Sequence, residues 1–275
     1  MSQEIIEKLK QQIEGYKDNP EWEEVGKVIE VGDGIIKISG LSNVQNQEVL
    51  YVEASNEKVK AVCLNLEEDA VGALVLGDSA KIMAGQTVKR TKQILSISVG
   101  EQLLGRVVDP LGNALDGKGP IFSSQELSSE ALAKGDNVKM MFLEHGAPNV
   151  LARESVNQPL HTGIKAIDAM IPIGRGQREL IIGDRGTGKT AIALDMIINQ
   201  GKESGRPTST YVAGQGKPVV CIYVAIGQKE SKIAKIVETL KNNNALDYTI
   251  VVSASASSPA SFWYLSPFAG CAIGE

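Results

Sequence analysis

The feature that most constrains the fold is a run of eight residues near the middle of the chain, at positions 183–190. It reads GDRGTGKT and matches the phosphate-binding pattern G-x-x-x-x-G-K-[ST] at every required position. Its glycines let the backbone curl so that successive N–H groups point at phosphate oxygens, while the lysine reaches the terminal phosphates and the last hydroxyl ligates Mg²⁺. The run predicts a nucleoside triphosphate site made of Gly183, Asp184, Arg185, Gly186, Thr187, Gly188, Lys189 and Thr190.

The residues on both sides of this loop have the character of a strand and a helix. Residues 179–182 (ELII) form a short apolar run of the kind expected for a buried parallel strand. Residues 191–200 are apolar on nearly all sides, which predicts a buried helix, and Gly201 is the expected C-terminal stop. A strand, a glycine loop and a helix N-terminus together favour anion binding, because the helix dipole and the unpaired N–H groups attract negative charge. An incidental glycine-rich turn would lack this context.

Length and charge exclude some classes of protein. The 275 residues, 43% of them hydrophobic, are enough for two domains with a substantial core. A net charge of -5 argues against a nucleic-acid binder that depends on a basic surface. No stretch approaches the roughly 18 apolar residues of a membrane-spanning helix, and the N-terminus has no signal-peptide pattern. We therefore expect any membrane association to go through partners.

The first third of the chain divides into a helix and a series of short strands. Residues 4–16 carry apolar side chains at helical spacing, which predicts an amphipathic helix within an N-terminal unit at 1–20. Asp33-Gly34 is a strong hairpin signal between the first two of six β-prone runs. These runs, within 21–92, are 25–31, 35–38, 48–52, 59–64, 72–76 and 86–89. Six short strands in so few residues predict a small closed barrel with a structural or assembly role.

The remainder, 93–275, reads as a nucleotide-binding α/β domain. Residues 104–113 predict a strand and a tight turn, whereas 123–149 show no clear period and allow no assignment. Beyond the loop, a strand is predicted at 219–226, then a helix from near Ser231 to the asparagines at 242–244, then a strand at 248–252. This is the order of a doubly wound α/β domain with a parallel sheet.

Several conspicuous side chains are expected to be structural. Lys89, Arg90 and Lys92 form a tight basic cluster, which we interpret as a solvated turn. The three cysteines are widely spaced among apolar neighbours, so we expect buried, reduced thiols and a reducing compartment. Surface or packing roles, rather than metal contacts, are expected for His145 and His161. Trp22 and Trp263 are expected to be core anchors rather than ligand contacts.

Six further blocks resemble signatures of the alpha subunits of F-type rotary, proton-translocating ATP synthases. In chain order they are VGDGI (31–35), LNLEED (64–69), GRVVD (105–109), TGIKAID (162–168), GRGQRE (174–179) and YVAIGQK (223–229). The resemblance runs nearly end to end and is far more specific than a lone phosphate loop. It implies an α/β P-loop NTPase domain with a RecA-like parallel sheet, preceded by a small N-terminal β-barrel.

The same resemblance implies ligands, partners and a place in the cell. The bound group would be ATP or ADP with Mg²⁺. The partners would be catalytic beta subunits in an alternating hexamer, the central-stalk gamma subunit, and a delta subunit bound by the N-terminal helix, with no nucleic acid. The complex would make ATP from a transmembrane proton gradient. The subunit would be peripheral on the cytoplasmic face of a bacterial plasma membrane, touching the membrane only through the ion-translocating sector.

One position separates the catalytic from the non-catalytic type of subunit in that family. Catalytic subunits carry a glutamate after the second strand, where it polarises the attacking water, and the matching residue here is Gln228. A neutral amide can orient water but cannot take its proton. The resemblance therefore implies a regulatory site with no catalytic residue, in which Gln228 joins the eight loop residues and Thr190 is the metal ligand.

The chain also departs from the family pattern. Gly186 stands where the loop usually has glutamine, Glu230 stands where the family often has arginine, and the segments 123–149 and 202–217 do not match. The family's Walker B strand, the arginine donated to the neighbouring catalytic site, and the helical C-terminal domain would all follow Glu275. We therefore expect a nucleotide-binding domain truncated before the Walker B strand, with the C-terminal helical domain absent.

Two other functions stay open at this stage. A self-sufficient hexameric NTPase motor of the secretion type would hydrolyse ATP alone, which Gln228 disfavours. An RNA translocase of the termination-factor type should have a basic, aromatic-rich barrel. The segment 22–90 instead has few aromatic residues and an acidic stretch at 67–69.

Overall fold

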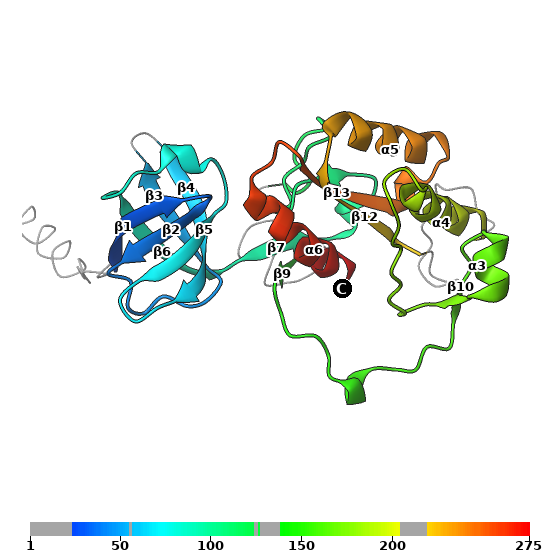
Figure 1. Ribbon diagram of the computed structural model, residues 1–275, viewed down its shortest axis with the longest axis horizontal. Helices are drawn as coiled ribbons and strands as arrows, with labels where there is room; N and C mark the ends of the chain where they lie inside the picture. The colour runs from blue at the N-terminus through cyan, green and yellow to red at the C-terminus, as the bar shows by residue number, and fades with distance from the viewer. Residues whose placement is uncertain (1–23, 55–56, 124–125, 127–137, 204–218) are drawn as a thin grey trace, which may run out of the picture.

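The computed structural model describes residues 24–54, 57–123, 126, 138–203 and 219–275. Within these ranges the chain forms a β-barrel and an α/β domain, which lie side by side in Figure 1. An apolar cluster that includes Val62 and Leu76 of the barrel and Ile97 and Val108 of the second domain joins the two. The predicted helix at 4–16 and Trp22 lie outside the described residues.

The barrel closes through six antiparallel strands, so none of them has a free edge. Hydrogen bonds join the strands in the order β1-β2-β5-β4-β3-β6, and β6 pairs back with β1. Their bounds are β1 Val25–Gly32, β2 Ile35–Ser39, β3 Glu48–Ala54, β4 Glu57–Leu66, β5 Val71–Val75 and β6 Thr87–Ile94, with the 3-10 turn η1 Ser79–Lys81 before β6. The six predicted strands and their closure are confirmed, with shifted ends.

The barrel core follows from the period-two alternation of its strands. Ile36 and Ile38 on β2, Leu50 and Val52 on β3, and Val88 on β6 are all 0% exposed. Alternate residues of a strand point to opposite faces, so one apolar set fills the interior while the other faces outward. Each such side chain contributes roughly 1.5–3 kcal/mol by leaving water.

The hairpin between β1 and β2 has the predicted turn. Asp33 and Gly34 both have positive φ, 46° and 80°. A two-residue loop with left-handed conformations at both positions is a type I′ turn, whose twist matches that of the flanking strands. The Asp-Gly pair therefore fixes the register in which Gly32 meets Ile35.

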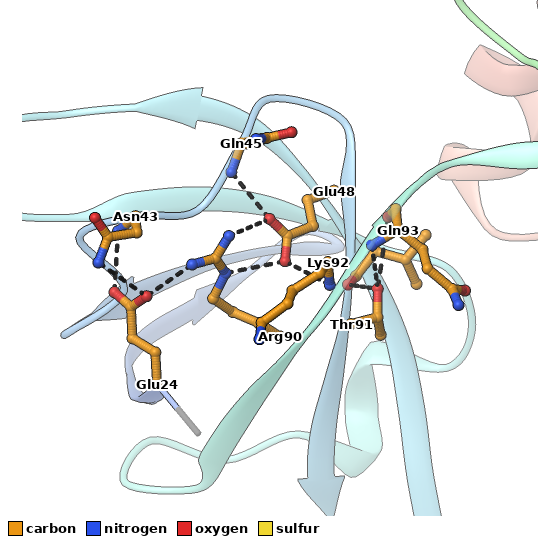
Figure 2. A network of polar contacts seen from close by, with 9 residues as sticks. Glu24, Asn43, Gln45, Glu48, Arg90, Thr91, Lys92 and Gln93 are labelled. Carbon is orange, nitrogen blue, oxygen red and sulfur yellow. Dashed lines mark hydrogen bonds and ion pairs between the residues drawn. The ribbon is translucent and has the colours of Figure 1, made fainter. Parts of the chain in front are cut away.

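The basic cluster at 89–92 is not a solvated turn, which corrects the prediction. Lys89 and Arg90 lie within β6, and the Arg90 guanidinium bridges two carboxylates, as Figure 2 shows. Its Nε and Nη2 donate to the two carboxylate oxygens of Glu48 at 3.0 and 2.8 Å, and its Nη1 donates to Glu24 at 2.7 Å. Glu48 is 1% exposed, and a carboxylate buried this deeply needs charged and hydrogen-bonding partners.

Burial pushes the pKa of Glu48 upward, but this effect is outweighed. Arg90 and the backbone N–H groups of Gln45 and Lys92 bind the ionised carboxylate and hold the pKa below its ordinary value. The network joins the residue before β1, the start of β3 and the middle of β6. It thus ties together the part of the barrel from which the chain leaves for the second domain.

The α/β domain is built on a parallel sheet, as predicted. Its strands, in the order β12-β13-β8, are Cys221–Gln228, Thr249–Ser255 and Val107–Val108. Helix α5, Glu230–Asn242, and helix α6, Ala260–Gly274, pack on opposite faces. Alternate residues of β13 divide accordingly, because Ile250 and Val252 belong to the cluster around α6 and Val251 to the cluster around α5.

Shorter elements complete the domain. Strand β9, Lys139–Phe142, pairs antiparallel with β7, Ser96–Val99, and lies in the stretch that the sequence left unassigned. The predicted helix after β12 is confirmed, since it ends at Asn242 and Asn244 follows with a φ of 52°. The other elements are η2 Glu101–Leu103, η3 Val150–Ala152, β10 Pro159–Leu160, α3 Lys165–Met170, β11 Ile173–Gly174, α4 Lys189–Glu203 and η4 Leu246–Tyr248.

Two side chains of α6 are more exposed than predicted. Cys63 and Cys221 are buried, which raises the pKa of their thiols to about 11 and about 12, but Cys271 is exposed. Trp263 is 37% exposed rather than a core anchor, although its indole N–H donates to the carbonyl of Ser255 at 2.7 Å. Trp263 is two positions from Leu265, and Cys271 is two positions from Ala269, and both of these partners belong to the cluster that packs on the sheet. Two positions along an α-helix lead to its opposite side, which is why Trp263 and Cys271 face outward. No helix within the described ranges is long and apolar enough to cross a membrane.

Candidate functional site

The loop at 183–190 curls by means of left-handed glycines. Gly186 and Gly188 have φ angles of 83° and 92°, and a Cβ added at either would meet nothing within 4 Å. Glycine is therefore required by the backbone conformation and not by crowding. At the start of the loop the neighbour does matter, because a Cβ on Gly183 would lie 3.0 Å from the Thr187 hydroxyl. Gly186, which stands where the family usually has glutamine, thus leaves a backbone that can curl around an anion.

The loop lysine lies across the loop itself. Lys189 Nζ donates to the carbonyls of Gly183 at 2.5 Å and Asp184 at 2.6 Å. The Thr187 hydroxyl donates to the same Asp184 carbonyl at 2.8 Å. These contacts hold the ammonium group at the mouth of the curled backbone, where a phosphate group would compete for it as a stronger, charge-assisted acceptor.

The loop leads directly into α4, which begins at Lys189. The first turn of this helix contains no acidic residue that would repel an anion from its N-terminal N–H groups. Thr190 lies in the same turn and is half-buried. An ammonium, a hydroxyl and free helical N–H groups meet within a few residues, which is the donor set that a magnesium-bound phosphate chain requires.

The predicted strand before the loop is wrong. Residues 179–182 form no strand, and Leu180 and Ile182 are 79% and 82% exposed. A strand is defined by hydrogen bonds to a neighbour, and no strand in the described part of the chain pairs with this segment. The apolar run is present, but the pairing that would bury it is not.

The predicted helix after the loop is confirmed, but two of its details are not. Its apolar side chains are only partly buried, with Leu194, Ile197 and Ile198 packed against the cluster of α5 and β13. The helix also continues past Gly201 to Glu203. Gly201 therefore does not stop the helix, and the reason for a glycine at this position is a neighbour, because a Cβ would lie 2.6 Å from the Tyr248 hydroxyl.

Gln228 ends β12 at an irregular point of the strand. Gly227 has a φ of 64°, and the register with β13 shifts between Ile226 and Gln228. The Gln228 amide nitrogen donates to the Tyr223 hydroxyl at 3.4 Å. Its amide oxygen is buried and has no hydrogen-bond partner among the described residues. Because such an acceptor is costly to leave unpaired, this oxygen is available to a ligand or a bound water. Its membership of the nucleotide site stays a prediction.

A cavity lies apart from the loop. It has a volume of about 780 Å³ and opens between α5 and the ends of β13 and β8, and its lining includes Ile233, Val237, Ser253, Ser255 and Lys118. None of the loop residues lines it. Beside it, Glu230 accepts hydrogen bonds from Ser255 and Ser257 at 3.3 and 2.6 Å. Sequence reasoning noted Glu230 only as a departure and missed these serines, which show no periodic signal.

The histidines have structural contacts in this structure. His145 pairs with Glu275, which raises the pKa of the imidazole, and also contacts the Phe142 carbonyl at 3.2 Å. The His161 carbonyl accepts hydrogen bonds from Asn199 and Gln200 of α4. In the part of the chain that the structure describes, no group of three or more His, Cys, Asp or Glu residues could hold a metal ion.

Models of a single protein family match two parts of the chain. The nucleotide-binding domain of the ATP synthase alpha/beta family matches residues 163–275, and the beta-barrel domain of the same family matches residues 22–92. The first match contains the loop, α4 and Gln228, and the second contains the six barrel strands except the end of β6.

Curated relatives are similar along almost the whole chain. ATP synthase subunit alpha of Parabacteroides distasonis is 53% identical over 272 residues, which is 99% of this chain and 47% of that protein. The same subunit of Phocaeicola vulgatus is 52% identical over 272 residues, with the same coverage. That of Dehalococcoides mccartyi is 52% identical over 273 residues, 99% of this chain and 48% of the relative. The chain thus spans about half the length of the curated relatives that it matches.

Proposed function

Because this chain belongs to the ATP synthase alpha/beta family, we propose that it binds ATP or ADP with Mg²⁺ as a non-catalytic, regulatory alpha subunit in the head of an F-type ATP synthase. The observation that carries the proposal is the loop: left-handed glycines at 186 and 188, Lys189 at the loop mouth, and Thr190 in the first turn of α4. Local backbone geometry of this kind supplies N–H groups that favour phosphate binding.

Each group in the loop has a distinct task toward the nucleotide. The backbone N–H groups would hold the phosphate oxygens, Lys189 would move from the loop carbonyls to the terminal phosphates, and the Thr190 hydroxyl would hold Mg²⁺. The metal, when bound, neutralises phosphate charge. The main contribution of this chain is therefore binding and orientation of the nucleotide.

The side chain at 228 supports a site that does not turn ATP over. The Gln228 amide has an unpartnered oxygen and an amide nitrogen directed at Tyr223, so it can hold a water molecule but cannot remove its proton. We propose that this neutral group keeps ATP intact at the site. ATP synthesis from ADP and phosphate would then take place on neighbouring catalytic subunits, driven by a transmembrane proton gradient.

The barrel supports a role in assembly. Val25, Ile29 and Ile35 on β1 and β2 are 44%, 53% and 51% exposed, although Val28, Ile36 and Ile38 on the same strands are buried. Exposed apolar side chains on a closed barrel are suited to contact with a partner. We propose beta subunits in an alternating hexamer as these partners, with gamma at the centre and delta at the N-terminal segment 1–20. The subunit would be peripheral to the cytoplasmic face of a bacterial plasma membrane.

Equilibrium binding of Mg-ATP to the purified chain tests the nucleotide assignment. Replacement of Lys189 by alanine removes a charged donor, which is worth about 1.5–3 kcal/mol, or about a 10-fold to 150-fold loss of affinity. Lys232→Ala is the matched control, because Lys232 is an exposed lysine in the first turn of α5. Equal affinity in wild type and Lys189→Ala would contradict the assignment. ATP hydrolysis by the isolated chain would instead favour a self-sufficient motor.

A further inference from the structure

Helix α4 is attached to the rest of the domain mainly at the end far from the phosphate loop. Side-chain hydrogen bonds join residues 197–201 of α4 to other elements. Tyr248 donates to the helix backbone, and Asn199 and Gln200 of the helix donate to the His161 carbonyl. At the other end, the loop makes its side-chain contacts to its own carbonyls, and the segment before it is unpaired. The position of the loop relative to the sheet is therefore set at the far end of α4.

The Tyr248 hydroxyl forms hydrogen bonds with backbone groups of this helix. Its oxygen donates to the carbonyl of Ile197 at 3.0 Å and lies 3.4 Å from that of Ile198. The backbone N–H of Gly201 faces the same oxygen. Residues 197 and 201 are i and i+4, the two positions that bond to each other in a regular α-helix. The phenol oxygen thus lies between two groups of the helical ladder and joins it to η4, directly before the central strand β13.

Gly201 makes room for this contact. A Cβ at that position would lie 2.6 Å from the Tyr248 hydroxyl, 2.9 Å from Cε1 and 3.0 Å from Cζ, so any other residue would displace the ring. The phenol is half-buried, and burial raises its pKa, so the hydroxyl stays protonated and can donate to the helix carbonyl. Glycine inside a helix is less favourable than alanine, so the glycine at this position is explained by the close phenol and not by helix formation.

A second tie at the same end prevents rotation of the helix. Asn199 Nδ2 and Gln200 Nε2 both donate to the His161 carbonyl, at 3.0 and 2.9 Å. Gly163 passes so close that a Cβ there would lie 2.6 Å from Asn199 Oδ1. With Tyr248 on one side and the chain at 161–163 on another, the end of α4 is fixed in direction as well as in place.

We propose that Tyr248 is a positioning residue for the nucleotide site: through its contact with the helix at Ile197 and Gly201, it fixes the direction of α4 and with it the position of the phosphate loop that leads into the helix. This inference rests on the proposed function, since it concerns how the same loop reaches its ligand. Tyr248 itself lies away from the loop, because its contacts at Ile197 and Gly201 are about 12–18 Å of helix from Lys189, at 1.5 Å per residue.

The test compares Mg-ATP affinity in three variants, measured by titration calorimetry of the purified chain well below its unfolding temperature. Tyr248→Phe removes only the hydroxyl and should weaken Mg-ATP binding at least fivefold. Gly201→Ala should weaken it as well, although alanine is the better helix former, because it pushes the phenol out of place. Thr249→Val is the matched control: it removes a fully buried hydroxyl, next in sequence to Tyr248, that donates to the Ala245 carbonyl at 2.6 Å and not to α4.

The variants separate positioning from a general loss of stability. All three should lower the midpoint of thermal unfolding or leave it near wild type, but only Tyr248→Phe and Gly201→Ala should change the affinity. If both bind Mg-ATP as tightly as wild type, the positioning role is wrong. If Thr249→Val weakens binding equally, the effect is one of stability and the inference is again overturned. If wild type and Lys189→Ala bind alike, the proposed function itself fails, which is a separate and distinguishable result.

Discussion

The barrel and the phosphate-loop segment differ in what holds them. Every barrel strand is paired on both sides, and its inward side chains reach 0% exposure. The segment that leads into the loop has no strand partner among the described residues, and Leu180 and Ile182 are about four-fifths exposed. The barrel thus carries its own stability, whereas the loop segment depends on the helix that follows it.

The two regions depend on different things: the curl of the loop depends on neighbouring residues, and the barrel depends on pairing between distant strands. The curl of a phosphate-binding pattern is a matter of local backbone conformation, here the positive φ angles of Gly186 and Gly188 and the start of α4. A strand needs a neighbour, and a barrel needs six strands of matching register. The loop can therefore keep the geometry that binds an anion even where the segment before it has none of the pairing of a sheet.

The largest difference between the two regions should be seen in limited proteolysis. Trypsin should cut after Arg175, Arg178 and Arg185 at least about tenfold faster than at the lysines of the barrel strands, because cleavage follows local opening. Mass spectrometry of the early fragments identifies the sites. Mg-ATP should slow the cut after Arg185. Initial cuts within the barrel would contradict the comparison.

Removal of the central cation of the barrel should have the next largest effect. Arg90→Ala leaves the buried Glu48 carboxylate without its charged partner, which should cost about 3–5 kcal/mol in the free energy of unfolding, measured with urea. Lys89→Ala on the same strand is the control, because its pair with Glu53 is exposed and should contribute less than about 1 kcal/mol. Similar losses in the two variants would show that the buried network does not hold the barrel together.

Acidification should weaken the same network. The pKa values of Glu24 and Glu48 lie below their ordinary value of 4.5, so their contribution is complete above that pH and is lost as the pH falls through the lowered values. We expect the free energy of unfolding of the wild type to fall as the pH is lowered below 4.5, and the difference from Arg90→Ala to narrow. A difference that stays constant over this range would mean that these carboxylates are not linked to barrel stability.

The smallest effect concerns the first hairpin. Gly34→Ala should cost about 1 kcal/mol, because the position has a φ of 80° and a Cβ there would meet nothing within 4 Å. The loss is therefore purely one of backbone conformation. Gly32→Ala, also with free space but without a positive φ, is the control and should be nearly neutral. Equal losses at both positions would contradict the type I′ turn.

Much of the fold could be predicted because its signals are local. The period-two runs, the Asp33-Gly34 turn and the apolar spacing of α5 each depend on a few neighbouring residues, and the structure confirms them. The predicted strand at 179–182 was wrong because pairing depends on distant residues. The ion pair of Arg90 was missed for the same reason, since Glu48 is 42 positions away along the chain.

The candidate site shows the same division. The loop residues and the start of α4 follow from eight consecutive positions, and their geometry agrees with the pattern. Gly201 was interpreted as a helix stop, whereas it accommodates Tyr248, 47 residues later. A glycine can be required by a positive φ angle or by a close neighbouring side chain, and the sequence alone does not distinguish these two causes.

The most direct test of the account is to identify the nucleotide that stays bound. The purified chain is incubated with Mg-ATP, separated from free nucleotide, denatured, and analysed by chromatography. The wild type should retain close to one nucleotide for each chain, still as ATP, and Lys189→Ala should retain almost none. No retained nucleotide in the wild type would contradict the phosphate-loop assignment, and conversion of the bound ATP to ADP would contradict the non-catalytic role of the Gln228 site.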